Sequence, residues 1–223
     1  NPGFDIENNV IGSLPLIEAC ASSQNVHLIF ASSGGTVYGL SESLPIRETH
    51  ATRPISTYGI SKIAVEHLIN MYHNSHSLNY TVLRISNAYG ERQDGATGQG
   101  VIGTWLTKLN EGGTIQMVDS GLPVRDYIYV KDIAQAICLA VEAGESNQTY
   151  NVGTGVGTSL NNLVRLLQTI VPTVPVIVPS SPRSFDIKSN ILDFRKIKEE
   201  LNWSPTTPLH KGISETWQQI STR

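Results

Sequence analysis

The chain has 223 residues, of which 39% are hydrophobic and 16% are charged, and its formal net charge is −3. This composition can bury a sizeable core, and the scattered lysines and arginines form no basic stripe of the kind that binds nucleic acid. No apolar run approaches the ~20 residues that a membrane-spanning helix needs, and no signal peptide is visible. We therefore expect a cytoplasmic protein with neither a nucleic-acid nor a membrane partner.

The cysteine and histidine patterns predict no metal site. Cys20 and Cys138 lie in apolar helical patterns, and the sequence contains no C-x-x-C. We expect two buried free thiols, which suits a reducing compartment. His73 and His76 are three residues apart, and we interpret them as a solvated helix end.

Strand and helix patterns alternate along the chain, which predicts an α/β fold with a largely parallel sheet and helices on its faces. The first helix is expected from Asn8 to about Ala21, with Pro15 kinking it or shifting its start. Apolar runs predict strands at 26–33, 80–86, 114–118, 125–130, 148–152 and 175–178. Helices are expected at about 56–73, 101–110, 131–143 and 159–170, followed by two closing helices.

Tyr58 and Lys62 carry the clearest chemical signal. Four residues apart on a helix, they share one face, and an ammonium beside a phenol favours the phenolate. Such a tyrosine can act as a general base or acid near neutral pH. Ser32 and Ser33 end the strand at 26–33, at the edge of the sheet where ligands of α/β folds bind. The set suits proton transfer to and from an alcohol, whereas no G-x-S-x-G surrounds Ser33 to favour a hydrolase.

Gly153, Gly155 and Gly157 resemble a dinucleotide-binding loop only at first sight. The pattern G-x-G-x-x-G would require glycine at 158, which is threonine. We interpret this stretch as a turn between a strand and a helix capped by Thr158 or Ser159.

Five motifs follow one another in a characteristic order. They are Ser-Ser-Gly-Gly-Thr-Val-Tyr-Gly at 32–39, Tyr-x-x-x-Lys at 58–62, Leu-Arg-Ile-Ser-Asn-Ala-Tyr-Gly at 83–90, Val-Arg-Asp-Tyr-Ile at 124–128 and Tyr-Asn-Val-Gly-Thr-Gly at 150–155. With them, the chain resembles the extended short-chain dehydrogenase/reductase family, in its nucleotide-sugar epimerase branch. The resemblance implies NAD as cofactor and a partial Rossmann-type, doubly wound parallel sheet with a smaller C-terminal α/β substrate-binding domain.

One motif of that family is missing from these 223 residues. The family opens with a glycine-rich loop that holds the NAD pyrophosphate at a helix N-terminus. No such loop occurs here, and Asn1 corresponds to a point beyond the family's first strands. We therefore expect a fragment or a truncated record, inactive alone, that binds a nucleotide sugar but no measurable NAD.

The resemblance assigns roles residue by residue. Ser33 orients the sugar hydroxyl, Tyr58 transfers the proton, and Lys62 holds the nicotinamide ribose and lowers the pKa of Tyr58. Because an extra glycine separates Ser33 from Tyr38, Ser32 stays an alternative. The implied cofactor-binding residues are Asn8, Ser33, Tyr58, Lys62 and Ser86. The implied substrate-binding residues are Ser33, Tyr58, Asn87, Gly100, Val101, Gln116, Val118, Arg125, Arg183 and Asp186.

The implied activity is NAD-dependent 4-epimerisation of a UDP-hexose through a 4-keto sugar. A decarboxylase or C4 reductase of the same family stays an alternative, as does an inactive fragment or regulatory binder. A 4,6-dehydratase is disfavoured, because Gly34 and Gly35 stand where that branch has carboxylates.

The resemblance also implies the domain organisation and a homodimer. Residues 1–90 are expected to form part of the NAD-binding domain and 91–223 mostly the substrate domain, with segments of about 114–150 returning to the first sheet. The dimer is expected to pair helices 8–21 and 56–73, with Ile63 and Ile69 facing away from the catalytic face.

Overall fold

The structure, a computed structural model, describes residues 1–23, 25–41, 43–93, 95, 98–144, 147–172, 175–180 and 187–222. Its N-terminal run is helical from Pro2 to Ala21 but changes type three times. The α-helix α1 (Pro2–Asp5) leads into a π-helical turn (Ile6–Val10), a 3-10 turn (Ile11–Ser13) and the α-helix α2 (Leu14–Ala21). Pro15 lies in the first turn of α2, where its missing N–H costs no hydrogen bond, so the predicted shift of the helix start is confirmed.

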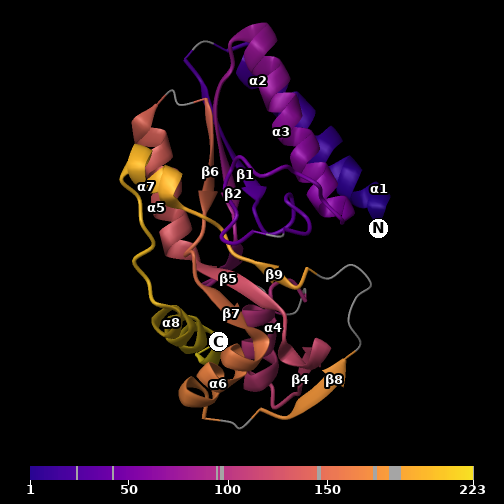
Figure 1. The fold of residues 1–223 in the computed structure, drawn as a ribbon, viewed down its shortest axis with the longest axis vertical. Coiled ribbons are helices and arrows are strands. Elements are labelled where there is room, and N and C mark those ends of the chain that lie inside the picture. The colour runs from indigo at the N-terminus through magenta and orange to yellow at the C-terminus, as the bar shows by residue number, and fades with distance from the viewer. Residues whose placement is uncertain are drawn as a thin grey trace.

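A three-stranded parallel sheet forms the upper part of the molecule in Figure 1. Its strands are β1 (His27–Ser33), β2 (Asn79–Ile85) and β6 (Gln148–Val152), in the order β1-β2-β6. The helices α2 and α3 (Thr57–His76) cover one face, whereas α5 (Val130–Ala143) and α7 (Arg195–Leu201) cover the other. The predicted α/β fold with a parallel sheet is confirmed.

Strand β2 shows why both faces are covered. Its side chains alternate, so that Tyr80 and Val82 pack against α2 and α3 while Leu83 and Ile85 pack against the side of α5 and α7. A strand that is apolar on both sides needs a helical layer on each, as parallel sheets have.

Helix α3 begins where the sequence predicts and ends later. The Ser56 side chain accepts a hydrogen bond from the Gly59 N–H and caps the helix, which continues to His76 instead of His73. Ser77, in the left-handed region at φ 56°, ends it. Ile69 is buried in the core and Ile63 packs against Val37 and Tyr38, so the expectation that both isoleucines face outward is wrong.

The lower part contains two further small sheets. One joins β3 (Asn87–Tyr89), β5 (Val124–Tyr129), β7 (Gly157–Ser159) and β9 (Ser189–Asn190), and the other joins β4 (Ile115–Val118) to β8 (Ile177–Ser180). The helices α4 (Val101–Asn110), α6 (Leu160–Ile170) and α8 (Leu209–Ser221) pack around them (Figure 1). Residues of about 114–150 were expected to return to the first sheet. Of the strands in this range, β6 pairs with β2 of the upper sheet, while β4 and β5 belong to the lower sheets. The domain boundary at residue 90 stays a prediction.

The loop that follows β6 binds a buried carboxylate. Asp126 of β5 accepts hydrogen bonds from the backbone N–H groups of Thr154, Gly155 and Leu192 and from the Thr154 hydroxyl. The Ser159 side chain caps α6 just after this turn. The glycines at 153–157 therefore join the lower sheet to the upper one.

Both cysteines are free thiols in the structure, but Cys138 is exposed, so its predicted burial is wrong. None of the helices that the structure describes combines the length and the apolar character needed to cross a lipid bilayer.

Candidate functional site

Tyr58 and Lys62 lie in the first two turns of α3, beside the end of β1. The Lys62 ammonium donates a hydrogen bond of 3.0 Å to the carbonyl oxygen of Ala31. It lies 5.7 Å from the centre of the Tyr58 ring and 4.9 Å from that of Phe30. Tyr58 keeps 41% of its surface exposed, so its phenol is open to a ligand.

The pKa of Tyr58 does not follow the sequence expectation. Burial raises the pKa of its phenol and the nearby Asp5 carboxylate raises it further, whereas Lys62 was expected to lower it. Burial also lowers the pKa of Lys62. Burial is the largest cause of the rise, so it favours the protonated phenol over the phenolate.

The two serines at the end of β1 have different environments. Ser32 is buried and its hydroxyl donates a 2.5 Å hydrogen bond to the Glu66 carboxylate. Ser33 is half-buried, and its hydroxyl and the Asn87 amide both lie within 4 Å of where a side chain on Gly35 would start. Of the two serines, Ser33 therefore faces the substrate-binding residues.

A buried ion pair that the sequence motifs did not point to lies behind these serines. Arg84 of β2 makes a two-pronged contact with Glu66 of α3, with its shortest N–O distance 2.7 Å, and also donates to the Tyr38 hydroxyl. The only signal in the sequence was spacing, because Glu66 is four residues beyond Lys62 and eight beyond Tyr58.

Asn9, not Asn8, contacts the Tyr58 helix. Asn8 is exposed and its amide donates to the Phe4 carbonyl within its own helical run. Asn9 lies in the π-helical turn and donates to the Ser61 hydroxyl, which in turn donates to the Tyr58 carbonyl. The sequence alone does not show which of two adjacent asparagines contacts α3. The π-helical turn places Asn9, and not Asn8, towards that helix.

Part of an NAD molecule fits this edge of the sheet. The Ser86 hydroxyl is buried with no hydrogen-bond partner among the described residues, and it follows β2 directly. Together with Tyr58 and Lys62 it offers hydroxyl and ammonium donors of the kind that a nicotinamide ribose needs. The pyrophosphate end has no glycine-rich loop among the 223 residues.

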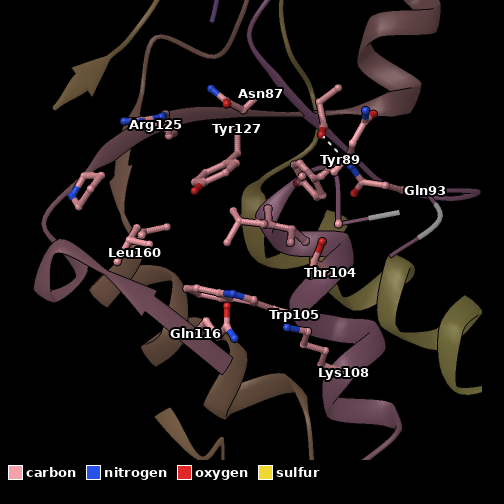
Figure 2. Close-up of a pocket in the computed structure, with 18 of the residues that line it drawn as sticks. Asn87, Tyr89, Gln93, Thr104, Trp105, Lys108, Gln116, Arg125, Tyr127 and Leu160 are labelled. Carbon is pink, nitrogen blue, oxygen red and sulfur yellow. Dashed lines mark hydrogen bonds between the residues drawn. The ribbon is translucent and has the colours of Figure 1, made fainter. Parts of the chain in front are cut away.

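A cavity of about 560 Å³ opens between β3, β5, β4 and α4 (Figure 2). The predicted substrate residues beyond the catalytic three line it wherever the structure describes them. They are Asn87, Gly100, Val101, Gln116, Val118 and Arg125. Arg183 and Asp186 lie outside the described residues. The cavity thus gathers residues from four separate elements.

Other residues that line this cavity were not predicted from the sequence. Trp105 and Lys108 follow Val101 at helical spacing on α4, and Tyr127 follows Arg125 by two residues on β5. Figure 2 shows Trp105 and Gln116 opposite Asn87 and Tyr127 across the cavity. Helix and strand periodicity could have predicted these residues. Trp105 and Lys108 share a face of α4 with Val101, and Tyr127 shares a face of β5 with Arg125.

Comparisons with known proteins agree with this arrangement. The sequence profile described as "NAD dependent epimerase/dehydratase family" matches residues 1–153. The UDP-glucose 4-epimerase of Mycolicibacterium smegmatis is 34% identical, over 97% of this chain and 69% of that protein. A dTDP-4-dehydro-6-deoxyglucose reductase of Escherichia coli is 35% identical, over 86% of this chain and 61% of that protein.

A solved structure extends the likeness to three dimensions. The crystal structure of UDP-glucose 4-epimerase from Thermotoga maritima, with UDP-glucose, superposes with a TM-score of 0.93 at 38% identity. The match covers 100% of this chain and 72% of that one. The profile match over most of the chain, the identity to its relatives and the shared fold together establish that the chain belongs to the NAD-dependent epimerase/dehydratase family.

Proposed function

We propose that this site epimerises a UDP-hexose at C4, with NAD as cofactor. The observation that carries the proposal is the shared position of Asn87. Its amide flanks Gly35, next to Ser33, and also lines the cavity between β5 and α4. A sugar nucleotide held in that cavity would therefore extend towards Ser33 and Tyr58.

The chain's own residues divide the work of proton transfer and binding. In its phenolate form Tyr58 takes the proton from the C4 hydroxyl and later returns it, while Ser33 donates a hydrogen bond to the same oxygen. Bound NAD would supply the hydride acceptor and donor that the reaction at C4 requires. Lys62 holds the ribose end of the cofactor beside Tyr58 with its ammonium.

Because the substrate is held by groups remote from C4, the hexose ring stays free to rotate in the site. Arg125 and the N-terminus of α4, at Gly100 and Val101, suit a diphosphate, because a guanidinium and free N–H groups both bind phosphate oxygens. Trp105 and Gln116 suit the nucleobase, since one offers a flat apolar face and the other an amide edge. The resemblance adds Arg183 and Asp186 on the diphosphate and ribose.

The test is conversion of UDP-glucose by the full-length protein loaded with NAD. We expect UDP-galactose as product, with no net consumption of NAD. Net oxidation of a reduced nicotinamide cofactor would indicate the C4 reductase instead, and release of carbon dioxide from UDP-glucuronate would indicate the decarboxylase. Absence of any product would contradict the proposal and favour the non-catalytic binder.

A homodimer in the cytoplasm completes the proposal. On the N-terminal helical run Phe4, Ile11 and Leu16 are exposed, and on α3 Ile60 and Met71 are exposed. Ile60 and Met71 are eleven residues apart, about three helical turns, and so share one face. An apolar face of this kind favours a second copy of the chain as its partner.

A further inference from the structure

The described residues contain five buried side-chain oxygen atoms without a hydrogen-bond partner in the protein, and three of them belong to residues that line the same cavity. The three are Gln93 Oε1, Thr104 Oγ1 and the Tyr127 hydroxyl. Native structures rarely leave buried polar atoms unpaired, because each loses its hydration without compensation. Their gathering around one cavity indicates that a ligand pairs with them.

Tyr127 is the most deeply buried of the three. It is 6% exposed, and in Figure 2 its ring projects from β5 into the cavity. Asn87 is its partner across the β3–β5 register, and Arg125 lies two residues earlier on the same face of the strand. The hydroxyl therefore stands beside two residues that the proposed function assigns to the diphosphate.

The phenol of Tyr127 is a hydrogen-bond donor. Burial raises its pKa well above the usual range, and the nearby Arg125 lowers that pKa by a smaller amount. At neutral pH the group is therefore protonated and can donate its hydrogen to an oxygen acceptor.

The other buried tyrosines in the described part of the chain all have partners. Tyr38 donates to Asn151 at 2.7 Å, Tyr129 to Glu215 at 2.9 Å and Tyr150 to Glu200 at 2.7 Å. Tyr80 and Tyr89 also make hydrogen bonds. Tyr89 also lines the cavity, but its hydroxyl donates to the Leu209 carbonyl, so among the buried tyrosines of the described residues Tyr127 is the one whose hydroxyl has no partner in the protein.

We propose that the Tyr127 hydroxyl is a ligand-binding group, which donates a hydrogen bond to an oxygen of the ribose–diphosphate chain of the bound nucleotide. Thr104, whose hydroxyl lines the same cavity from α4, is its counterpart on the other side. The inference rests on the proposed function, because it takes the nucleotide part of the substrate as the ligand.

The experiment compares Tyr127→Phe with Tyr150→Phe. Each change removes one buried hydroxyl without altering the shape of the ring, but the Tyr150 hydroxyl already has Glu200 as its partner. Calorimetric titration of wild type and both variants with UDP, UMP and uridine gives the affinities, and thermal unfolding without ligand gives Tm.

Opposite results are expected for the two variants. Tyr127→Phe should bind UDP about tenfold more weakly, the scale of one lost hydrogen bond to a charged acceptor, and keep or raise the Tm of the free protein. Tyr150→Phe should lower Tm and leave the affinity for UDP unchanged. A loss already present with uridine assigns the ribose as acceptor, whereas a loss confined to UMP or UDP assigns a phosphate.

Two outcomes would overturn the inference, and they are distinguishable from failure of the proposed function. Equal UDP affinity of wild type and Tyr127→Phe would show that the hydroxyl meets no ligand atom. A lower Tm of free Tyr127→Phe would reveal a partner within the protein. If wild type itself bound no UDP, the proposed function would fail, and the inference with it.

Discussion

Tyr58 is a phenol at the start of a helix and is 41% exposed, with the Lys62 ammonium 5.7 Å from its ring centre and the Asp5 carboxylate near enough to raise its pKa. Its chemistry depends on how easily it exchanges a proton with the substrate. Lys62 binds the Ala31 carbonyl, which directs its charge towards the end of β1. The Tyr58 phenol, the Lys62 ammonium and the Asp5 carboxylate form the smallest set of side chains to which a function can be assigned.

Replacing Tyr58 by phenylalanine removes the proton carrier and keeps the ring. We expect Tyr58→Phe to lower kcat by at least about 10²-fold in the NAD-loaded protein, the usual scale of positioned acid–base catalysis. Tyr72→Phe is the matched control, because Tyr72 lies on the same helix and its hydroxyl contacts only the exposed Glu18. Turnover of Tyr58→Phe within a few-fold of wild type, measured with UDP-glucose, would refute its role.

Asp5 offers a test of the pKa of Tyr58. Its negative charge raises that pKa, so at a fixed pH it reduces the fraction of phenolate. We expect Asp5→Asn to lower the pKa of Tyr58 and to move the acid limb of the kcat/KM profile to lower pH. Glu7→Gln, an exposed change next to α1, serves as control and should leave the profile in place. A profile of Asp5→Asn that coincides with wild type would contradict the assignment of Tyr58 as the titrating group.

Helix α3 is held against the sheet by the ion pair between Glu66 and Arg84. The pair is buried and joins α3 to β2, while Ser32 ties the same carboxylate to β1. Because Glu66 lies one turn beyond Lys62, the contact sets how α3 sits relative to Ser33. A buried charge pair stabilises a fold only while both partners are present.

Breaking this pair leaves an uncompensated buried charge. We expect Glu66→Gln to reduce the free energy of unfolding by about 3–5 kcal/mol, as measured by urea denaturation. Glu18→Gln, which changes an exposed glutamate on α2, should cost less than about 1 kcal/mol. A loss in Glu66→Gln no larger than in the control would mean that solvent reaches Arg84 and that the pair does not hold α3.

The apolar face proposed for the dimer consists of exposed side chains of the N-terminal helical run and α3, which lie side by side on the outer side of the upper sheet (Figure 1). The dimer proposal rests on this face and not on Ile63 and Ile69, which lie against the core. The catalytic face begins on the same helix, at Tyr58, so pairing of two copies would also hold the start of α3.

Charge placed on that face should prevent pairing. We expect the double variant Ile60→Lys/Met71→Lys to sediment as a monomer where wild type sediments as a dimer, because two buried ammonium groups would be desolvated. Leu122→Lys is the control, since Leu122 is exposed in the lower part of the molecule. A monomeric wild type at micromolar concentration, or a dimeric double variant, would rule out this interface.

The sequence by itself determined the longer helices and strands and the chemical types at the site, but not the short elements α1, β3, β7 and β9. Caps such as Ser56, the helix at 101–110 and the alternation along β2 depend on residues within about one turn or one strand of each other, so a local pattern records them. The order of five motifs identified the family and six residues of the cavity. Helix ends and the burial of Cys138 were less well predicted, because they depend on what packs alongside.

The tertiary structure decided which side chains are partners. Ser32 is paired with Glu66 across 34 positions and Tyr38 with Asn151 across 113, and no local pattern contains such a contact. The same long-range packing brought Asn9 rather than Asn8 to α3, and it left Tyr127 as the buried tyrosine without a partner. Hydrogen-bond partners far apart in the chain meet only when the whole chain has packed. A local sequence pattern therefore does not show which side chains will pair.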